Sequence, residues 1–392
     1  MSETTENNRR SRALKTLTVV FIALGVVYAL WWVIHGRFHE STDDAYVQGN
    51  VVQVTSQVAG SVVAIHVEDT DFVKAGTLLV KLDEADTRVA LEQAEADLAR
   101  SVREVRGLFS SDAALAAEVL QREADLSRAK EDLARRQTVA GTGAVSTEDV
   151  QHATTALKSS EAALAAAREK LNATRAMTAG TSVENHPNVR RAAARVKEAF
   201  LAQARTSILA PVSGYVAKRS VQAGQRVAPG APLMAVVPLD SLWADANFKE
   251  VQLAHMRVGQ PVNIRADLYG GSVDYHGKIV GLGAGTGSAF ALLPAQNATG
   301  NWIKVVQRLP VRVALDPKEL AEHPLRIGLS LVADVDTSNR EGKPVTEATR
   351  TQPAAATDVY GDRLKLAEAR VREIVMANLV APKDGEDSGK SR

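Results

Sequence analysis

The chain carries the stretch Gln57-Val-Ala-Gly-Ser-Val62 and repeats its pattern in Ala210-Pro-Val-Ser-Gly-Tyr-Val216. A second stretch, Asp71-Phe-Val-Lys-Ala-Gly-Thr-Leu-Leu79, is matched in the same way by Gln225-Arg-Val-Ala-Pro-Gly-Ala-Pro-Leu233. Both pairs align at one constant offset of 154 residues, glycine on glycine. Short runs rich in β-branched residues, bounded by glycines, predict strands and tight turns. The sequence therefore predicts two halves of one small β module, separated by a long insertion.

The insertion between the two halves has the pattern of two antiparallel helices. Leucine and valine recur every seven residues along both arms, with small residues in the partner positions, as in a narrow coiled-coil seam. Asp83 is expected to cap the outgoing helix, and Ser146, with Asp149 three residues later, to cap the returning one. Weak helix-forming stretches at 107–112 and 180–187 predict a joint at one common level in both arms. We therefore expect a jointed helical hairpin.

An uncharged run of 18 residues extends from Leu17 to Ile34. As a helix it spans about 27 Å, close to the thickness of the hydrocarbon core of a bilayer. Four basic residues precede it, so the positive-inside rule predicts a single-pass anchor with 1–16 in the cytoplasm and the remainder outside. A cleaved signal peptide is the competing interpretation, but Trp31-Trp-Val-Ile-His35 stands where a small-x-small cleavage site is expected.

Composition excludes several classes of function. The net charge of +1 gives no reason to propose nucleic acid as a partner. The absence of cysteine excludes disulfide scaffolds, thiolate metal sites and cysteine nucleophiles. Aromatic residues make up only 4% of the chain, which favours long helices and thin β modules over one large globular core.

The remaining chain predicts a third unit and a tail. Residues 242–336 alternate short β-rich runs with glycine and proline turns, which is typical of a small β-barrel. Beyond 337 the composition is polar; 362–379 is a possible short amphipathic helix, and 381–392 is expected to be disordered. The full predicted division is a cytoplasmic tail at 1–16, an anchor at 17–34, a first half-module at 45–82, a helical hairpin at 83–206, a second half-module at 207–240, a β-barrel at 241–336 and a C-terminal tail at 337–392.

The β module resembles a lipoyl or biotinyl carrier domain split in two, so a covalent cofactor is one hypothesis to test. Lys81 is the nearest candidate for a modified lysine, but it runs straight into the insertion and lacks the exposed hairpin of a carrier. His35 and His39 have a ligand-like spacing with no evident third ligand. The glycine-rich run 281–287 lacks the lysine of a P-loop. We therefore expect no cofactor, no metal site and no catalytic residue.

Several longer motifs carry a family resemblance. They include Thr42-Asp-Asp-Ala-Tyr-Val47, Trp243-Ala-Asp-Ala-Asn-Phe-Lys-Glu250 and the long run from Leu293-Pro-Ala-Gln-Asn-Ala to Arg308-Leu-Pro-Val311. With the order of anchor, split lipoyl-like module, hairpin and barrel, they resemble the EmrA-like branch of the HlyD family. These proteins are periplasmic adaptors, or membrane fusion proteins, of tripartite multidrug efflux pumps. The resemblance covers about 17–336.

The resemblance implies an elongated α+β adaptor that is not an enzyme. Its anchor would lie in the inner membrane of a Gram-negative bacterium, and copies would form a ring. Its partners would be a major-facilitator drug exporter and a TolC-type outer-membrane channel. Adaptors of this kind that engage such channels carry an Arg, a Leu and a Ser at the hairpin tip, at positions matched here by Arg135, Val139 and Ser146. An adaptor of type I peptide or protein secretion is the alternative within transport, and a lipoyl or biotinyl carrier is the alternative from another class.

Overall fold

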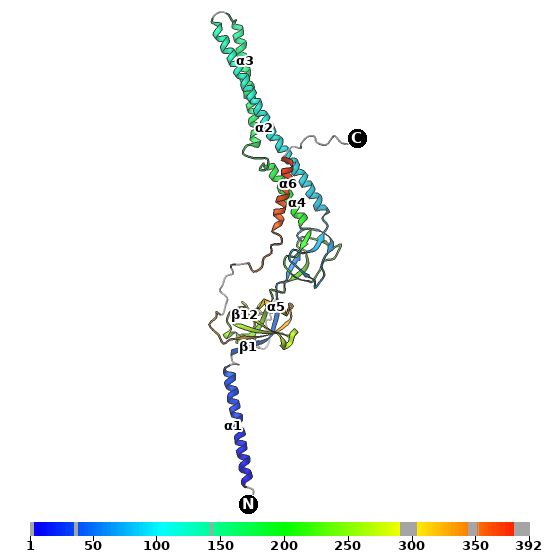
Figure 1. Ribbon diagram of the computed structural model, residues 1–392, viewed down its shortest axis with the longest axis vertical. Helices are drawn as coiled ribbons and strands as arrows, with labels where there is room; N and C mark the ends of the chain where they lie inside the picture. Colours follow the sequence, from blue (N-terminus) through cyan, green and yellow to red (C-terminus); the bar gives the residue numbers. More distant parts are fainter. Residues whose placement is uncertain are drawn as a thin grey trace, which may run out of the picture.

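A computed structural model describes residues 4–34, 38–141, 144–290, 304–343, 351 and 353–379, with the side chains of 4–12 and 30–34 left out. The molecule is elongated, and its parts follow one another along a single long axis (Figure 1). From the N-terminal end these are a lone helix, a β-barrel, a small β module and a helical rod. The elongated α+β architecture with a hairpin and a barrel is confirmed.

The small β module consists of two four-stranded sheets, and each sheet takes strands from both sides of the insertion. A shift of 154 residues converts the strand order of one sheet into that of the other, so the repeat seen in the sequence is a structural pseudo-two-fold. Alternate side chains of both sheets meet in a shared core that includes Leu79, Leu82, Val216 and Val236. The strand order of the first sheet is β2 (Val52–Thr55), β9 (Pro232–Val237), β7 (Gly214–Ala217) and β4 (Phe72–Val73). The strand order of the second sheet is β6 (Ser207–Leu209), β5 (Leu78–Leu82), β3 (Gly60–Ile65) and β8 (Arg226–Val227).

Gly76 and Gly230 show how closely the two halves match. Both have φ of +84°, in the left-handed region that L side chains avoid. The amide of Gly76 donates to the carbonyl of Ala210, and the amide of Gly230 donates to that of Ser56, at 2.8 and 2.7 Å. Each half therefore closes a turn of the other. Both four-stranded sheets are complete only when the returning arm has brought the second half back to the first.

The β-barrel is closed by six strands and packs a core that includes Phe248, Met256, Ile264 and Tyr275. One of the six, β1, comes from the N-terminal side of the β module, so the predicted barrel at 241–336 was missing a strand. The predicted first half-module also started too early, because 45–48 pair with β10 inside the barrel. The strand order around the barrel is β1 (His39–Gln48), β10 (Trp243–Lys249), β13 (Arg308–Leu315), β12 (Asp274–Leu282), β11 (Pro261–Ala266) and β14 (Ser330–Asp336), with η2 (Glu250–His255), η3 (Asp267–Ser272) and α5 (Pro317–Glu322) between strands.

The outgoing arm of the hairpin is one helix, α2 (Ala85–Ala140), of 56 residues. The N-cap position of α2 is Glu84, whose side chain makes no capping bond, so the predicted cap at Asp83 is displaced by one residue. The carboxylate of Asp83 still accepts a hydrogen bond from the amide of Ala85 at 2.9 Å. The predicted break at 107–112 is wrong. A glycine inside a helix costs only about 1 kcal/mol relative to alanine, and Val102 and Val105 just before Gly107 are buried against neighbouring helices.

The returning arm does break where the sequence predicted, into α3 (Thr147–Thr178) and α4 (Pro187–Ala204). Gly180 takes φ of +71° just after α3, and Pro187 begins α4. Between them His186 is buried; its Nδ1 accepts from the amide of Asn188, and its Nε2 donates to the carbonyl of Met177 at 3.1 Å. The joint is therefore confined to one arm, and the continuous α2 supports it.

The C-terminal part contains the predicted amphipathic helix, α6 (Asp362–Leu379), which packs along α2 and α4 at the base of the rod (Figure 1). Ile374 and Val375 enter the core that α2 and α4 share. The carboxyl end of α6 is capped by Arg106, which donates to the carbonyl of Asn378 at 3.2 Å. The lower rod is thus a three-helix bundle, and only the upper rod is a two-helix coiled coil. The expectation of disorder at 381–392 falls outside the described residues.

At the opposite end of the molecule, α1 (Thr4–Ile34) stands apart from the barrel (Figure 1). Among the described residues, no helix has both the length and the apolarity needed to cross a membrane. The anchor at 17–34 stays a prediction, and the side chains of its last five residues lie outside the described part.

Candidate functional site

The tip of the rod is the candidate site, and Arg135 is the first of its predicted members along the chain. It lies on the last turns of α2, with 70% of its side chain exposed. Its guanidinium is 3.6 Å from the carboxylate of Asp132 on the same helix face. Since an exposed pair at this spacing contributes little to stability, Arg135 is free to exchange Asp132 for an acceptor on another protein.

Val139 and Ser146 lie on either side of the tip loop, whose residues 142–143 are outside the described part. Val139 is the second-last residue of α2, with 40% of its surface exposed. Ser146 caps α3: its hydroxyl accepts from the amide of Asp149 at 3.1 Å, and the Asp149 carboxylate accepts from the Ser146 amide at 3.3 Å. The predicted capping box is confirmed. Ser146 therefore has a structural role that any contact with a partner must share.

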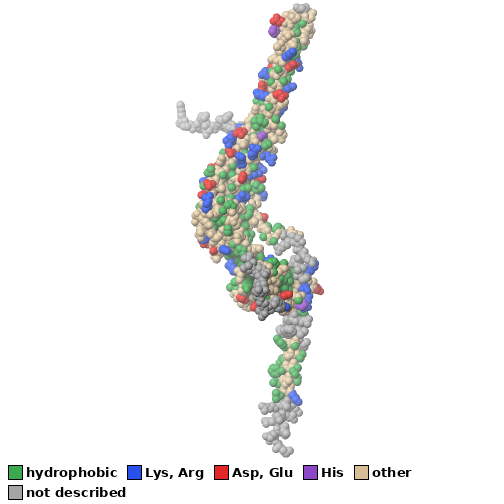
Figure 2. Space-filling model, turned by 180° about the vertical axis from the view of Figure 1, so that it is seen from behind, with side chains coloured by type: hydrophobic (Ala, Val, Ile, Leu, Met, Phe, Trp, Pro, Cys, Tyr) green, Lys and Arg blue, Asp and Glu red, His purple; other side chains and the backbone are tan. Residues whose placement is uncertain are grey.

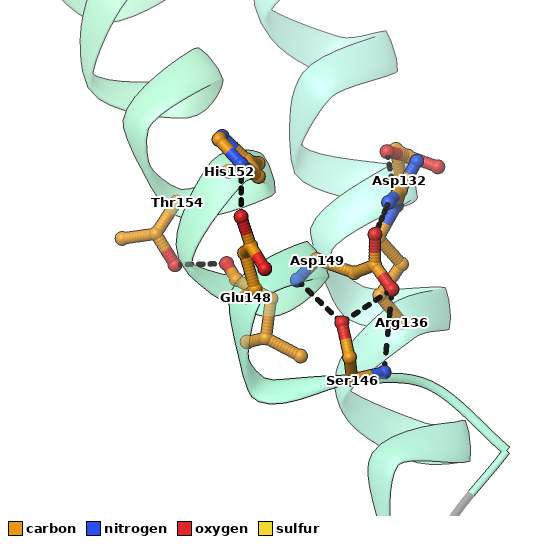
Figure 3. A network of polar contacts seen from close by, with 8 residues as sticks. Asp132, Arg136, Ser146, Glu148, Asp149, His152 and Thr154 are labelled. Atoms are coloured by element: carbon orange, nitrogen blue, oxygen red, sulfur yellow. Dashed lines mark hydrogen bonds and ion pairs between the residues drawn. The ribbon is translucent and has the colours of Figure 1, made fainter.

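Arg136 is the tip residue that sequence reasoning missed. Figure 3 shows it between Asp132 of its own helix and Asp149 of α3. Its Nε donates to Asp132 at 2.9 Å, and its Nη1 lies 3.9 Å from Asp149. A pair of adjacent arginines was visible in the sequence, but helical geometry places them about 100° apart around the axis. Only the position of α3 decides which of them faces the partner helix.

The electrostatics of the tip centre on Asp149. Hydrogen bonds from the hydroxyl and the amide of Ser146 hold the pKa of the Asp149 carboxyl below its ordinary value, and the positive charge of Arg136 lowers it further. Asp149 is therefore ionised at neutral pH. The same carboxylate caps the first turn of α3 and pairs with Arg136 of α2. It therefore connects the ends of the two helices.

The structure gives no support to the carrier hypothesis. The ammonium of Lys81 donates to Glu84 at 2.5 Å and to the hydroxyl of Ser207 at 3.2 Å, so it is engaged inside the module. Within the described residues, no group of three acidic or histidine side chains could hold a metal ion. His39 instead pairs with Asp334 at 2.7 Å, and His35 lies outside the described part.

On the face of the rod seen in Figure 2, basic and acidic side chains are both spread along its length among apolar ones. Several pairs join the two arms across the coiled coil, including Arg168 with Glu123 at 2.7 Å and Arg175 with Asp112 at 3.3 Å. Inside, Val119, Leu164 and Leu171 form the small apolar core of this part. With so small a core and so polar a surface, this part of the molecule is an extended coiled coil rather than a globular domain.

Comparison with known proteins gives close relatives over nearly the whole chain. A family described as "EMRA, alpha-helical hairpin domain" matches residues 85–206. The chain is 47% identical over 353 residues, 90% of each protein, to "Multidrug export protein EmrA" of Escherichia coli strain K12. It is 49% identical to "Fatty acid resistance protein FarA" of Neisseria gonorrhoeae, over 94% of this chain and 92% of that one. A solved structure titled "Structure of the periplasmic adaptor protein EmrA" matches with a TM-score of 0.37 and 20% identity, over 76% of this chain and 98% of that one.

Proposed function

The chain belongs to the EmrA family, and on that premise we propose that it is the periplasmic adaptor of a multidrug efflux pump. In this role it binds and positions other proteins and catalyses no reaction. Its partners are a major-facilitator transporter in the inner membrane and a TolC-type channel in the outer membrane, and copies of the chain form a ring around the exit path.

The observation that carries this proposal is the unbroken helix α2. Its 56 residues correspond to a length of about 84 Å at about 1.5 Å per residue. The returning arm brings the chain back to the β module, where each half closes a turn of the other. One polypeptide thus supplies a long reach from a fixed base, as coupling across a periplasm requires.

The proposed membrane anchor is α1. Its large apolar side chains between Leu14 and Tyr28 are all more than half exposed. They include four consecutive residues at 19–22, which at about 100° per residue point to every side of the helix. A helix that is apolar all round has no inner face to bury against the protein. A lipid environment satisfies it, and the arginines at 9, 10 and 12 favour a cytoplasmic N-terminus.

The rod tip is the proposed contact with the outer-membrane channel. Arg135 offers an exposed cation and Val139 an exposed apolar group, while the cap at Ser146 holds α3 in register with α2. A cross-linking experiment tests this, and the chain suits it because it contains no cysteine. Val139→Cys, labelled with a photoactivatable cross-linker in cells, should capture the channel.

The matched control is Leu120→Cys, which is 67% exposed on the same helix and lies about 28 Å below Val139 at about 1.5 Å per residue. Capture from position 139 and not from 120 supports the tip contact. Equal capture from both positions, or none from either, contradicts it. Export itself is scored separately, as drug resistance restored to a strain that lacks its own adaptor.

A further inference from the structure

Four strongly exposed apolar residues gather at one end of the β-barrel. Val251, Phe290, Val305 and Val306 expose 78, 73, 63 and 55% of their surfaces. They lie in the loops that follow β10 and β12 and precede β13, three strands that are neighbours in the barrel. We call these four residues the apolar rim.

Hydrogen bonds hold the loops of the apolar rim together. The amide of Glu250 donates to the carbonyl of Gln307 at 3.1 Å, and the hydroxyl of Ser288 donates to the side chain of Gln307 at 2.6 Å. Gln307 therefore connects the residue before Val251, the loop of Phe290 and the loop of the two valines. The three loops that carry the apolar rim are therefore bonded to one another, and large apolar side chains exposed together usually mark an interaction site.

The apolar rim lies at the end of the barrel where the chain arrives from α1. The side-chain amide of Gln252, in η2, donates to the carboxylate of Glu40 and the carbonyl of Ser41 at the start of β1, at 3.0 and 3.1 Å. Five residue steps separate Ile34, the end of α1, from His39, the start of β1. Even fully extended, they span only about 17 Å. The barrel end is therefore tethered close to the end of α1.

We propose that the apolar rim rests on the outer face of the membrane that holds α1, with its side chains inserted at the boundary between headgroups and acyl chains. This inference rests on the anchor in the proposed function. A lipid surface fits because the exposed charges beside the rim, Lys249, Glu250 and Lys304, are of mixed sign, so attraction comes from apolar burial rather than from charge. Contact with the membrane would fix the tilt of the whole rod.

The absence of cysteine makes a depth measurement direct. The full chain, with Val251→Cys or Val305→Cys carrying a fluorescent label, is placed in phospholipid nanodiscs that contain lipids spin-labelled near the headgroup. Leu268→Cys is the matched control. Leu268 is 57% exposed in η3, which follows β11 at the end of the barrel opposite the apolar rim. Val26→Cys, near the middle of the apolar run 17–34, reports the anchor in parallel nanodiscs whose lipids are spin-labelled deep in the acyl chain. Circular dichroism confirms that each labelled protein is folded.

We expect quenching at positions 251 and 305 to exceed that at 268 by about two-fold or more, as interfacial insertion implies. Quenching at 26 with none above control at 251 and 305 overturns the apolar rim proposal and leaves the anchor standing. Absence of quenching at 26 contradicts the anchor itself. If 251 and 305 are shielded only after a transporter is added to the nanodisc, the rim is a protein contact and the membrane proposal is wrong.

Discussion

Arg370 of α6 forms a bidentate ion pair with Glu95 of α2, although 275 residues separate them in the chain. The Nε and Nη2 atoms of Arg370 donate to the two carboxylate oxygens of Glu95 at 2.7 and 2.8 Å. The hydrogen bonds to the carboxylates of Glu95 and Glu373, and then the negative charges of these groups, raise the pKa of Arg370 above its ordinary value. The C-terminal helix is thus fixed to the base of the rod in one register.

Removing this pair should loosen α6. For Arg370→Ala we expect the local free energy of opening of α6 to fall by about 1 kcal/mol, because the pair is bidentate but partly exposed. Hydrogen exchange of the α6 amides measures it. Lys365→Ala is the control, since its pair with Asp362 is about 80% exposed on both sides. An equal effect of the two substitutions would show that the Glu95 contact adds nothing.

Reversing the charge at the tip should stop export. Arg135→Asp places a second acidic group beside Asp132 and removes the exposed cation, and we expect drug resistance to be lost while helix content and membrane location stay unchanged. Arg128→Asp is the control. Arg128 is 75% exposed and pairs with Asp125 at the same spacing, two turns lower on α2. Resistance unchanged by Arg135→Asp would exclude Arg135 from the channel contact.

The cap at the tip should weaken in acid. Because the pKa of Asp149 is lower in the folded protein than its unfolded value of about 3.9, the cap stabilises α3 above that value. The stabilisation is lost as pH falls through the depressed folded pKa. Hydrogen exchange in the first turn of α3, corrected for intrinsic rates, should show this loss. Asp149→Asn should abolish the pH dependence, while Glu148→Gln, at an exposed neighbouring position, should keep it.

Replacing Thr70 with glycine should stabilise the β module. It takes φ of +79°, and its counterpart at the offset of 154, Gly224, takes +82°. The left-handed conformation costs an L residue about 1–2 kcal/mol, and glycine loses about 0.5–1 kcal/mol in chain entropy. We expect Thr70→Gly to raise the free energy of unfolding by up to about 1 kcal/mol and Gly224→Thr to lower it. Chemical denaturation monitored on the β module checks both, and destabilisation by Thr70→Gly would contradict the strain at this position.

Much of the candidate site was predictable because its signals are local. The cap at Ser146 needs only Asp149 three residues later, and the break near Pro187 needs only the residues that disfavour a helix. The direction of Arg135 and Arg136 was not predictable. Adjacent residues point to different sides of a helix, and the sequence does not say where the partner helix lies.

The split β module was predictable from the amino-acid pattern, because an offset of 154 residues repeats both its apolar positions and the glycines at its turns. The coiled-coil seam was predictable too, because heptads state which face of a helix is buried. Tertiary structure alone decided that β1 closes the barrel, that α6 completes the base of the rod, and that α2 continues through Gly107. Each of these features depends on packing against residues far away in the chain. The free energy gained by that burial outweighs weak local preferences for secondary structure. A local sequence pattern does not show which distant element will supply the packing surface.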